Sequence, residues 1–243
     1  AIYANIAREN DGIEPIYTQE GLNHFKNGTD PLNFADTNWR KLVMNDWAPQ
    51  QKHTVRLTGG NESNRYYVSL GHINQNSMYK NDNHWMKRTN FRLSQSSNIE
   101  AIGLQVNATI DGYRQHQTHP YTSTAEGYYQ VFSHITNKYP TTPGLNKYGL
   151  PYNIADNPVA ETAKDAGYIR TINNVINGKG ELIWSVPWVE GLKVRAASNY
   201  RYYSNSTKKW RKDAAVYDWD SESPQYANKP LLRYENSNGY AFT

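Results

Sequence analysis

The residue types that most often catalyse reactions or bind metals are sparse in this sequence. His116 and His119 lie three residues apart, and Asp218, Asp220 and Glu222 alternate with other residues. The histidines lack acidic or cysteine companions, and the acids do not fit the spacing of an EF-hand loop, so neither set predicts a site. There are no cysteines, and we find no phosphate-binding loop, dinucleotide fingerprint or His-Glu-x-x-His motif. We therefore expect no catalytic residue, no metal site, no cofactor and no enzymatic activity.

Aromatic and arginine side chains are the remaining candidates for binding. The chain has 20 Tyr and 7 Trp, and aromatic rings with a few polar groups suit a sugar-like or peptide-like ligand. The candidate ligand-binding aromatics lie in or beside the long connections between predicted strands, which are described below and which we expect to be extracellular loops. They are Trp85, Tyr121, Tyr129, Tyr139, Tyr148 and Tyr152. Five arginines lie on the polar face of predicted strands, which would border the lumen of a β-barrel. Pairing of these arginines with other side chains across the lumen is a simpler interpretation than ligand binding. They are Arg56, Arg65, Arg92, Arg195 and Arg201.

Composition excludes several classes of protein. The 243 residues carry 26 Lys+Arg and 22 Asp+Glu, and the densest basic run, residues 208–212, is more typical of a solvated loop than of a phosphate-binding surface. We therefore expect no nucleic-acid partner. An aromatic content of 13% argues against a disordered chain. No run approaches the ~20 apolar residues of a membrane-spanning helix, whereas the strands of a membrane β-barrel are half polar.

Alternation of apolar and polar residues predicts at least six strands. The alternating segments are 53–59, 64–74, the residues around Phe91 and Leu93, 102–111, 181–186 and 192–201. One face is aliphatic and then aromatic near the strand ends, and the other carries Arg, Asn, Gln, Thr and Ser. Such faces fit the wall of an outer-membrane barrel, and they also fit any antiparallel sheet with one wet side.

Three short helices are predicted beside these strands. Thr18 caps the first, Asp36 or Thr37 caps the second, and Ser123 begins the third with Glu126 completing a capping box. The residues expected to form their apolar faces are Leu22 and Phe25, then Trp39, Leu42, Val43 and Trp47, then Tyr128, Val131, Phe132 and Ile135.

Connection lengths favour the barrel. They alternate between short (60–63, 96–100, 187–190) and long (75–84, 112–167, and the polar segment after Tyr203). Alternate connections of an antiparallel sheet lie at the same end, and outer-membrane barrels have short turns at one end and long loops at the other. The predicted fold class is an all-β, antiparallel transmembrane β-barrel segment with short periplasmic turns, long extracellular loops and small helical inserts.

A series of motifs occurs in a recognisable order. They are Asn-Asp-Gly at 10–12, Gly-Thr-Asp-Pro at 28–31, Asp-Thr-Asn-Trp at 36–39, Thr-Gly-Gly-Asn-Glu at 58–62, Arg-Tyr-Tyr-Val-Ser-Leu-Gly-His at 65–72, Asn-Pro-Val-Ala at 157–160 and Gly-Leu-Lys-Val at 191–194. In this order, over roughly residues 1–203, the chain resembles the SusC/RagA-like family of TonB-dependent outer-membrane transporters. Thr58 and His72 depart from the Ser and Tyr of the family pattern, and Asp36 and Asn38 are exchanged relative to it.

The resemblance implies import of oligosaccharides, peptides or other large nutrients across the outer membrane of a Gram-negative, Bacteroidota-like bacterium. It implies three partners: a SusD-like lipoprotein over the extracellular mouth, the TonB–ExbB–ExbD complex acting through a plug, and outer-membrane lipid around the wall. On this resemblance residues 1–243 belong to one barrel domain and form its first part. The plug, the TonB-contacting segment and the C-terminal strands are then expected to lie outside this sequence. Loops 75–84 and 112–167 are where the lid and the ligand are expected to make contact.

Two rival interpretations stay open from the residues alone. A soluble carbohydrate-binding β-sandwich would pack the apolar faces of two sheets together and hold a glycan with its loop aromatics. A secreted glycan-active enzyme would need two facing acids ~5–10 Å apart, and the sequence nominates no such pair. On the barrel interpretation the isolated chain is expected to need detergent, because open sheet edges and an unburied apolar face favour aggregation.

Overall fold

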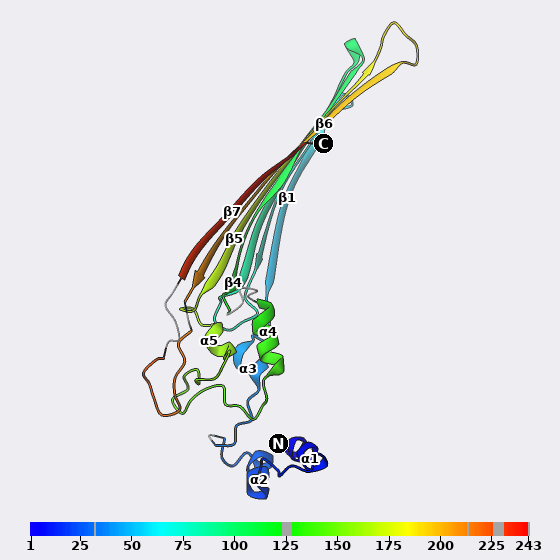
Figure 1. Ribbon diagram of the computed structural model, residues 1–243. Helices are drawn as coiled ribbons and strands as arrows, with labels where there is room; N and C mark the ends of the chain where they lie inside the picture. The colour runs from blue at the N-terminus through cyan, green and yellow to red at the C-terminus, as the bar shows by residue number, and fades with distance from the viewer. Residues whose placement is uncertain (32, 123–127, 213, 226–230, 243) are drawn as a thin grey trace.

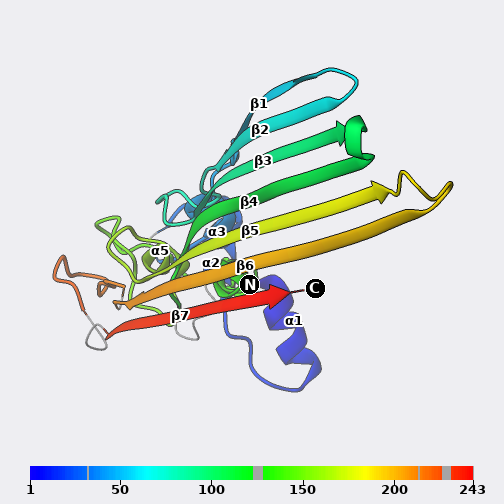
Figure 2. The same cartoon turned by 90° about the horizontal axis from the view of Figure 1, so that it is seen from above.

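The strands form one antiparallel sheet whose order follows the chain, so that every neighbouring pair is a hairpin (Figures 1 and 2). This computed structural model describes residues 1–31, 33–122, 128–212, 214–225 and 231–242. The strands are β1 (Gln50–Gly60), β2 (Asn64–Gln75), β3 (Trp85–Ile99), β4 (Leu104–Pro120), β5 (Tyr168–Ser185), β6 (Lys193–Arg211) and β7 (Leu231–Phe242). The predicted all-β antiparallel class is confirmed. Within the described residues the sheet is open, so closure into a barrel stays a prediction.

Short helices make up the rest of the regular structure. They are α1 (Ile2–Asn10), α2 (Gln19–Asn27), α3 (Trp39–Val43), α4 (Tyr128–Asn137), α5 (Pro158–Glu161) and the 3₁₀ turn η1 (Glu100–Ile102). No helix among the described residues combines the length and the apolar character needed to cross a membrane.

The register places the apolar side chains of neighbouring strands side by side. Leu57 is paired with Val68, Val68 with Leu93, and Leu93 with Ile110. A second row begins with Val55 paired with Leu70. Because side chains alternate between the two faces of a strand, this register gathers the aliphatic residues on one face and the polar residues on the other.

The strands extend beyond the segments predicted from alternation. β4 continues to Pro120 and β6 to Arg211, and β7 lies within the region after Tyr203 that was expected to be a polar loop. The strand predicted to begin at Ile102 begins at Leu104, because Gly103 adopts a left-handed φ of 65° that closes the preceding turn. Main-chain hydrogen bonds sustain a strand where both faces are polar, so alternation marks only the first half of β4 and of β6, next to the short turns.

The short and long connections lie at opposite ends of the sheet, as predicted. The turns after β1, β3 and β5 lie at one end, and the long segments after β2, β4 and β6 lie at the other with α3, α4 and α5 (Figure 1). The helices α1 and α2 lie beyond that loop end (Figure 1).

The helix predictions hold in part. The Thr18 side chain caps α2 by accepting from the Gly21 N–H at 3.2 Å. The cap of α3 is Asn38 rather than Asp36 or Thr37, because the Asn38 Oδ1 atom accepts from the Lys41 N–H at 2.9 Å. The starting residues predicted for the third helix, Ser123 and Glu126, lie outside the described residues, as does the side chain of Tyr128.

Two predicted packing residues are exposed. The helix α3 ends at Val43, since Met44 is extended and bridges to Tyr79, and Trp47 therefore lies outside it with 84% of its surface exposed. Phe132 is half-exposed on α4. The helix α1 was not predicted, because its N-cap residue Ala1 supplies no side-chain cap.

A buried core lies at the loop end of the sheet. We call it the cap core; it consists of Trp39, Val43, Tyr79, Val131 and Ile135. Its residues come from α3, the β2–β3 connection and α4, so it fastens three separate segments together.

Candidate functional site

A band of exposed aliphatic side chains crosses one face of the sheet. We call it the aliphatic belt; its members are Val55, Leu57, Val68, Leu70, Leu93, Ile110, Leu182 and Val194, all exposed. Val55 exposes 72% of its surface, although β-branched side chains of soluble sheets are usually buried. A contiguous apolar surface of this kind marks contact with a partner or a membrane.

Aromatic side chains lie at the edge of the belt nearest the short turns, where Trp184 is paired with the belt residue Val194. The rings of Trp184 and Trp188 meet edge to face with centroids 5.4 Å apart, and the Trp184 Nε1–H donates to the Ile102 carbonyl at 3.0 Å. The Tyr66 ring lies over Gly59, where an added side chain would collide with it. Trp and Tyr in such positions are typical of a boundary between apolar and aqueous surroundings.

The opposite face carries a chain of polar contacts that crosses four strands. Ser96 donates to Asn107 at 2.8 Å, Asn107 donates to Glu181 at 2.9 Å, and Glu181 also pairs with Arg195. Hydrogen bonds between neighbouring strands therefore satisfy the polar side chains here without a second protein layer.

All five candidate arginines lie on this polar face, and all are exposed. Arg56 and Arg92 share a row with Arg201, separated by polar residues of the intervening strands. Arg195 pairs with Glu181, and Arg65 lies near the short turns in the row of Asn107. Their role in lining a lumen stays a prediction.

The six candidate aromatics all lie at the loop end, but the structure does not place them in one pocket. Trp85 begins β3 and meets the His116 ring edge to face at 4.8 Å, and Tyr152 meets Trp219 at 5.6 Å. Tyr129, Tyr139 and Tyr148 are exposed, and Tyr121 is partly exposed after the end of β4. Their role in ligand binding stays a prediction.

A cleft at the loop end contains an aromatic residue that the sequence analysis did not select. It has a volume of about 450 Å³ and lies between the start of α3, the turn at 143–146 and Trp219. Lys41 and Lys80 also line it. Trp219 lies between Asp218 and Asp220 in the sequence, and these neighbours give no sign that it lies close to α3.

The residues first weighed as metal ligands do not form sites. Asp218 accepts a hydrogen bond from Asn153 at 2.9 Å, whereas Asp220 pairs with Lys147, so these acids serve separate contacts. His116 packs on Trp85, and His119 lies 5.2 Å from the ring of His84. Among the described residues neither set brings three ligand atoms together.

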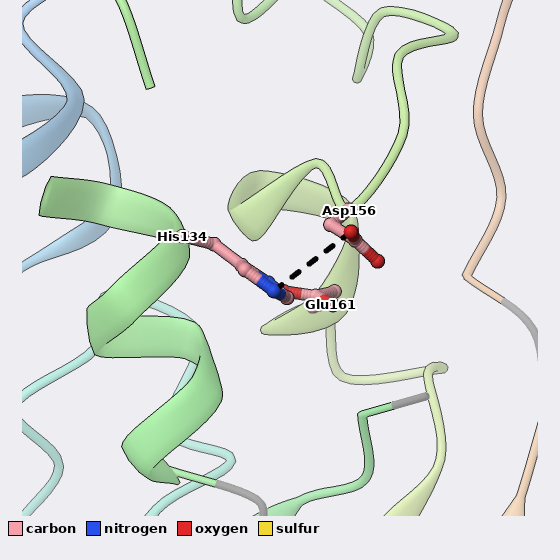
Figure 3. Close-up of side chains that lie close together, drawn as sticks. All are labelled: His134, Asp156 and Glu161. Atoms are coloured by element: carbon pink, nitrogen blue, oxygen red, sulfur yellow. Dashed lines mark hydrogen bonds and ion pairs between the residues drawn. The ribbon is translucent and has the colours of Figure 1, made fainter. Parts of the chain in front are cut away.

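A different cluster does bring a histidine and two acids together, at the contact between α4 and α5 (Figure 3). The His134 Nδ1 atom lies 2.8 Å from the Glu161 Oε2 atom, and the His134 Nε2 atom lies 3.9 Å from the Asp156 Oδ2 atom. Burial raises the pKa of Glu161, and the hydrogen bond with His134 opposes that rise. The residues are separated by 22 and 5 positions in sequence, so no local motif could have identified them.

The similarity of the chain to known proteins lies in its fold. No family model matches it, and no curated protein matches it. A chain in the solved structure of the RagAB peptide importer in the 'closed-closed' state superposes on 97% of this chain with a TM-score of 0.62 and 17% sequence identity. The match covers 28% of that chain, so the 243 residues correspond to a minor part of its length. At this identity the chain shares a fold with part of a larger protein from a peptide importer.

Proposed function

We propose that the chain is a section of the wall of a TonB-dependent outer-membrane transporter of the SusC/RagA type. On this proposal the aliphatic belt faces lipid, the polar face borders the lumen, and the loop end is extracellular. The section conducts nutrients without catalysis, and its partners are a SusD-like lipoprotein and, through a plug, the TonB–ExbB–ExbD complex.

The observation that carries the proposal is the exposure of the aliphatic belt. Its members on β1 to β4 lie in register across neighbouring strands, and aromatic side chains lie at its edge nearest the short turns. The strands that bear the belt are 11 to 19 residues long. A membrane β-strand needs about 9–11 residues, so each of these strands is long enough to cross, and β3 to β6 extend further.

The sandwich interpretation has less support. A sandwich requires a second sheet against the apolar face, and the strands described here form a single sheet. The cap core lies beyond the end of the sheet and does not cover the belt, whose members are all exposed.

The proposal specifies the cargo only by its chemical class. A peptide or an oligosaccharide is consistent with the fold shared with the RagAB peptide importer and with the aromatic residues at the loop end. The cleft between α3 and Trp219 is lined by one aromatic side chain, two lysines and Asp36, a set of groups that suits a polar cargo.

Two arginine substitutions on adjacent residues of β1 test the proposal. Val55 belongs to the aliphatic belt, whereas Thr54 points to the polar face, and both side chains are exposed. An arginine facing lipid near the bilayer midplane costs about 2–4 kcal/mol. We therefore expect Val55→Arg to lower the free energy of unfolding in phospholipid vesicles by that amount and Thr54→Arg to change it by less than about 1 kcal/mol.

The contrast between the two variants decides the outcome. In a soluble protein both residues would face water, and exposed substitutions of this kind usually change stability by about 0.5 kcal/mol or less. Equal effects of the two substitutions in vesicles, or folding of the wild-type chain in plain buffer as a monomer, would contradict the proposal.

A further inference from the structure

The contact between α4 and α5 is built from rigid parts. Val131 and Ile135 anchor α4 in the cap core. On the other side, Asn157 caps α5 by accepting from the Val159 N–H at 3.0 Å, and it donates to the carbonyls of Gly144 and Tyr152. The residues before and after this cap are therefore held in place.

Three side chains converge between these parts. His134 projects from α4 toward Asp156 and Glu161, which lie on either side of the α5 cap (Figure 3). One nitrogen or oxygen atom from each residue lies within 4.8 Å of those of the other two.

The charges at this contact are incompletely balanced. The Glu161 side chain is only 11% exposed, and a second carboxylate, Asp156, lies on the other side of the same imidazole. A buried carboxylate is costly unless a cation pairs with it. The Lys138 ammonium nearby donates to the carbonyl of Ala155 at 2.6 Å. With a neutral imidazole, two negative charges share one small site.

We infer that His134, Asp156 and Glu161 form a divalent-cation site, for which Zn²⁺ is the best-fitting ion. An imidazole nitrogen and two carboxylate oxygens are ligand types that Zn²⁺ accepts, whereas Ca²⁺ and Mg²⁺ prefer oxygen ligands alone. With Zn–N and Zn–O bonds of about 2.0–2.2 Å, donors in a tetrahedral site lie ~3.3 Å apart. The 3.9 Å separation between His134 and Asp156 is close to this, and the Asp156 side chain, 48% exposed, has room to approach.

The ion would replace contacts that the three residues now make with each other. The two ring nitrogens of His134 face different carboxylates, and a metal ion binds only one of these nitrogens. The ion would therefore take one ring nitrogen, and the carboxylate that now faces the other nitrogen would turn toward the ion. Binding would release any proton held between these groups. Binding would fasten α4 to α5 next to the cap core and so stabilise the loop end. This inference does not depend on the proposed transport function.

The test is a zinc titration of the full chain in detergent micelles after treatment with a chelator. We expect one Zn²⁺ per chain by calorimetry and a higher thermal unfolding midpoint, with much weaker responses to Ca²⁺ and Mg²⁺. Asp156→Asn removes one ligand charge at an exposed position, and asparagine tolerates the φ of 49° found there. We expect this variant to bind Zn²⁺ roughly tenfold or more weakly.

A matched control lies in the same loop. Asp165→Asn makes the same change in charge, but Asp165 pairs with Lys212 at 3.6 Å and takes no part in the cluster. Its zinc affinity should equal that of the wild type, and His134→Gln should lose affinity as Asp156→Asn does. The inference is overturned if the wild type binds no zinc stoichiometrically, if both aspartate variants bind alike, or if Ca²⁺ binds more tightly than Zn²⁺.

Discussion

The cap core and the aliphatic belt contain similar apolar side chains in opposite surroundings. In the cap core Tyr79 is fully buried and Trp39 is 4% exposed, whereas every member of the belt is exposed. The same chain therefore stabilises its two ends differently. The cap core gains from removing its own side chains from water, and the sheet relies on its main-chain ladders and on whatever covers the belt.

The cap core and the sheet also differ in what they require from their surroundings. A core that buries its own residues folds wherever the chain is in water. A sheet with an exposed aliphatic face gains its hydrophobic stabilisation only from an apolar environment. On the proposed function, the loop end holds its structure through local packing and the sheet gains its hydrophobic stabilisation from lipid, so the two regions should respond to different perturbations.

Removal of a cap-core side chain is expected to have the largest effect. Trp39 packs in the core and its Nε1–H donates to the Tyr139 carbonyl at 3.1 Å. Trp39→Ala should cost about 3–5 kcal/mol, because it creates a cavity in the cap core and removes this hydrogen bond. Hydrogen exchange should show the loss at α3 and α4 and leave the strands protected.

Trp47 provides the control for that substitution. It lies eight residues further along the chain and is 84% exposed, so Trp47→Ala should change stability by no more than about 0.5 kcal/mol. If Trp39→Ala also deprotected the strands of the belt, the two regions would be one cooperative unit and the comparison would fail.

Acidification tests the junction between the two regions. His84 lies between Tyr79 of the cap core, 5.7 Å away, and His119 of β4. Burial, with a smaller contribution from His119, lowers the pKa of His84 from 6.5 to about 4. At His84 the folded state thus binds fewer protons than the unfolded state between these values, so the contribution of this residue to stability is constant above pH 6.5 and falls as the pH decreases toward 4.

The expected loss is smaller than that from Trp39→Ala, because the ring is only partly buried and water screens its charge. Thermal midpoints measured at several pH values should show it as a shallower slope in His84→Gln, whose side chain does not titrate. An identical slope in the variant would place the acid sensitivity elsewhere.

The fold was predictable from sequence to the extent that the pattern of side chains determines it. Apolar residues such as Leu57 and Val68 alternate with polar residues along the strands, and this alternation predicts the two faces and the antiparallel class. The lengths of the segments between the alternating stretches predict the short and long connections. The ends of β4 and β6 were not predictable in this way, because their last residues are polar on both faces. The seventh strand was missed because Asn236 and Asn238 interrupt the period-two series of Leu232, Tyr234, Tyr240 and Phe242.

The candidate sites differ in the same way, because some depend on local alternation and others on packing between distant segments. The five arginines lie on the polar face, which strand alternation predicts because it is a local rule, and their position in a lumen stays a prediction. The cluster of His134, Asp156 and Glu161 depends on how α4 packs against α5, and no local rule reports that packing. Trp219 likewise reaches the cleft near α3 only through the long-range arrangement of the loops.

The smallest predicted effect compares one substitution in both regions. Gly149, at the loop end, and Gly191, in the turn between β5 and β6, have φ values of 78° and 80°, and an added Cβ would meet no atom within 4 Å at either. Gly→Ala at each position should therefore cost about 1–2 kcal/mol from the left-handed backbone alone. Since the chemical change is the same, hydrogen exchange isolates the response of each region. Gly149→Ala should lower the protection of backbone amides only at the loop end, and Gly191→Ala should lower it only at the β5–β6 turn. Deprotection of both ends by either variant would show that stability passes along the strands, and the cap core and the sheet would then have to be treated as a single unit.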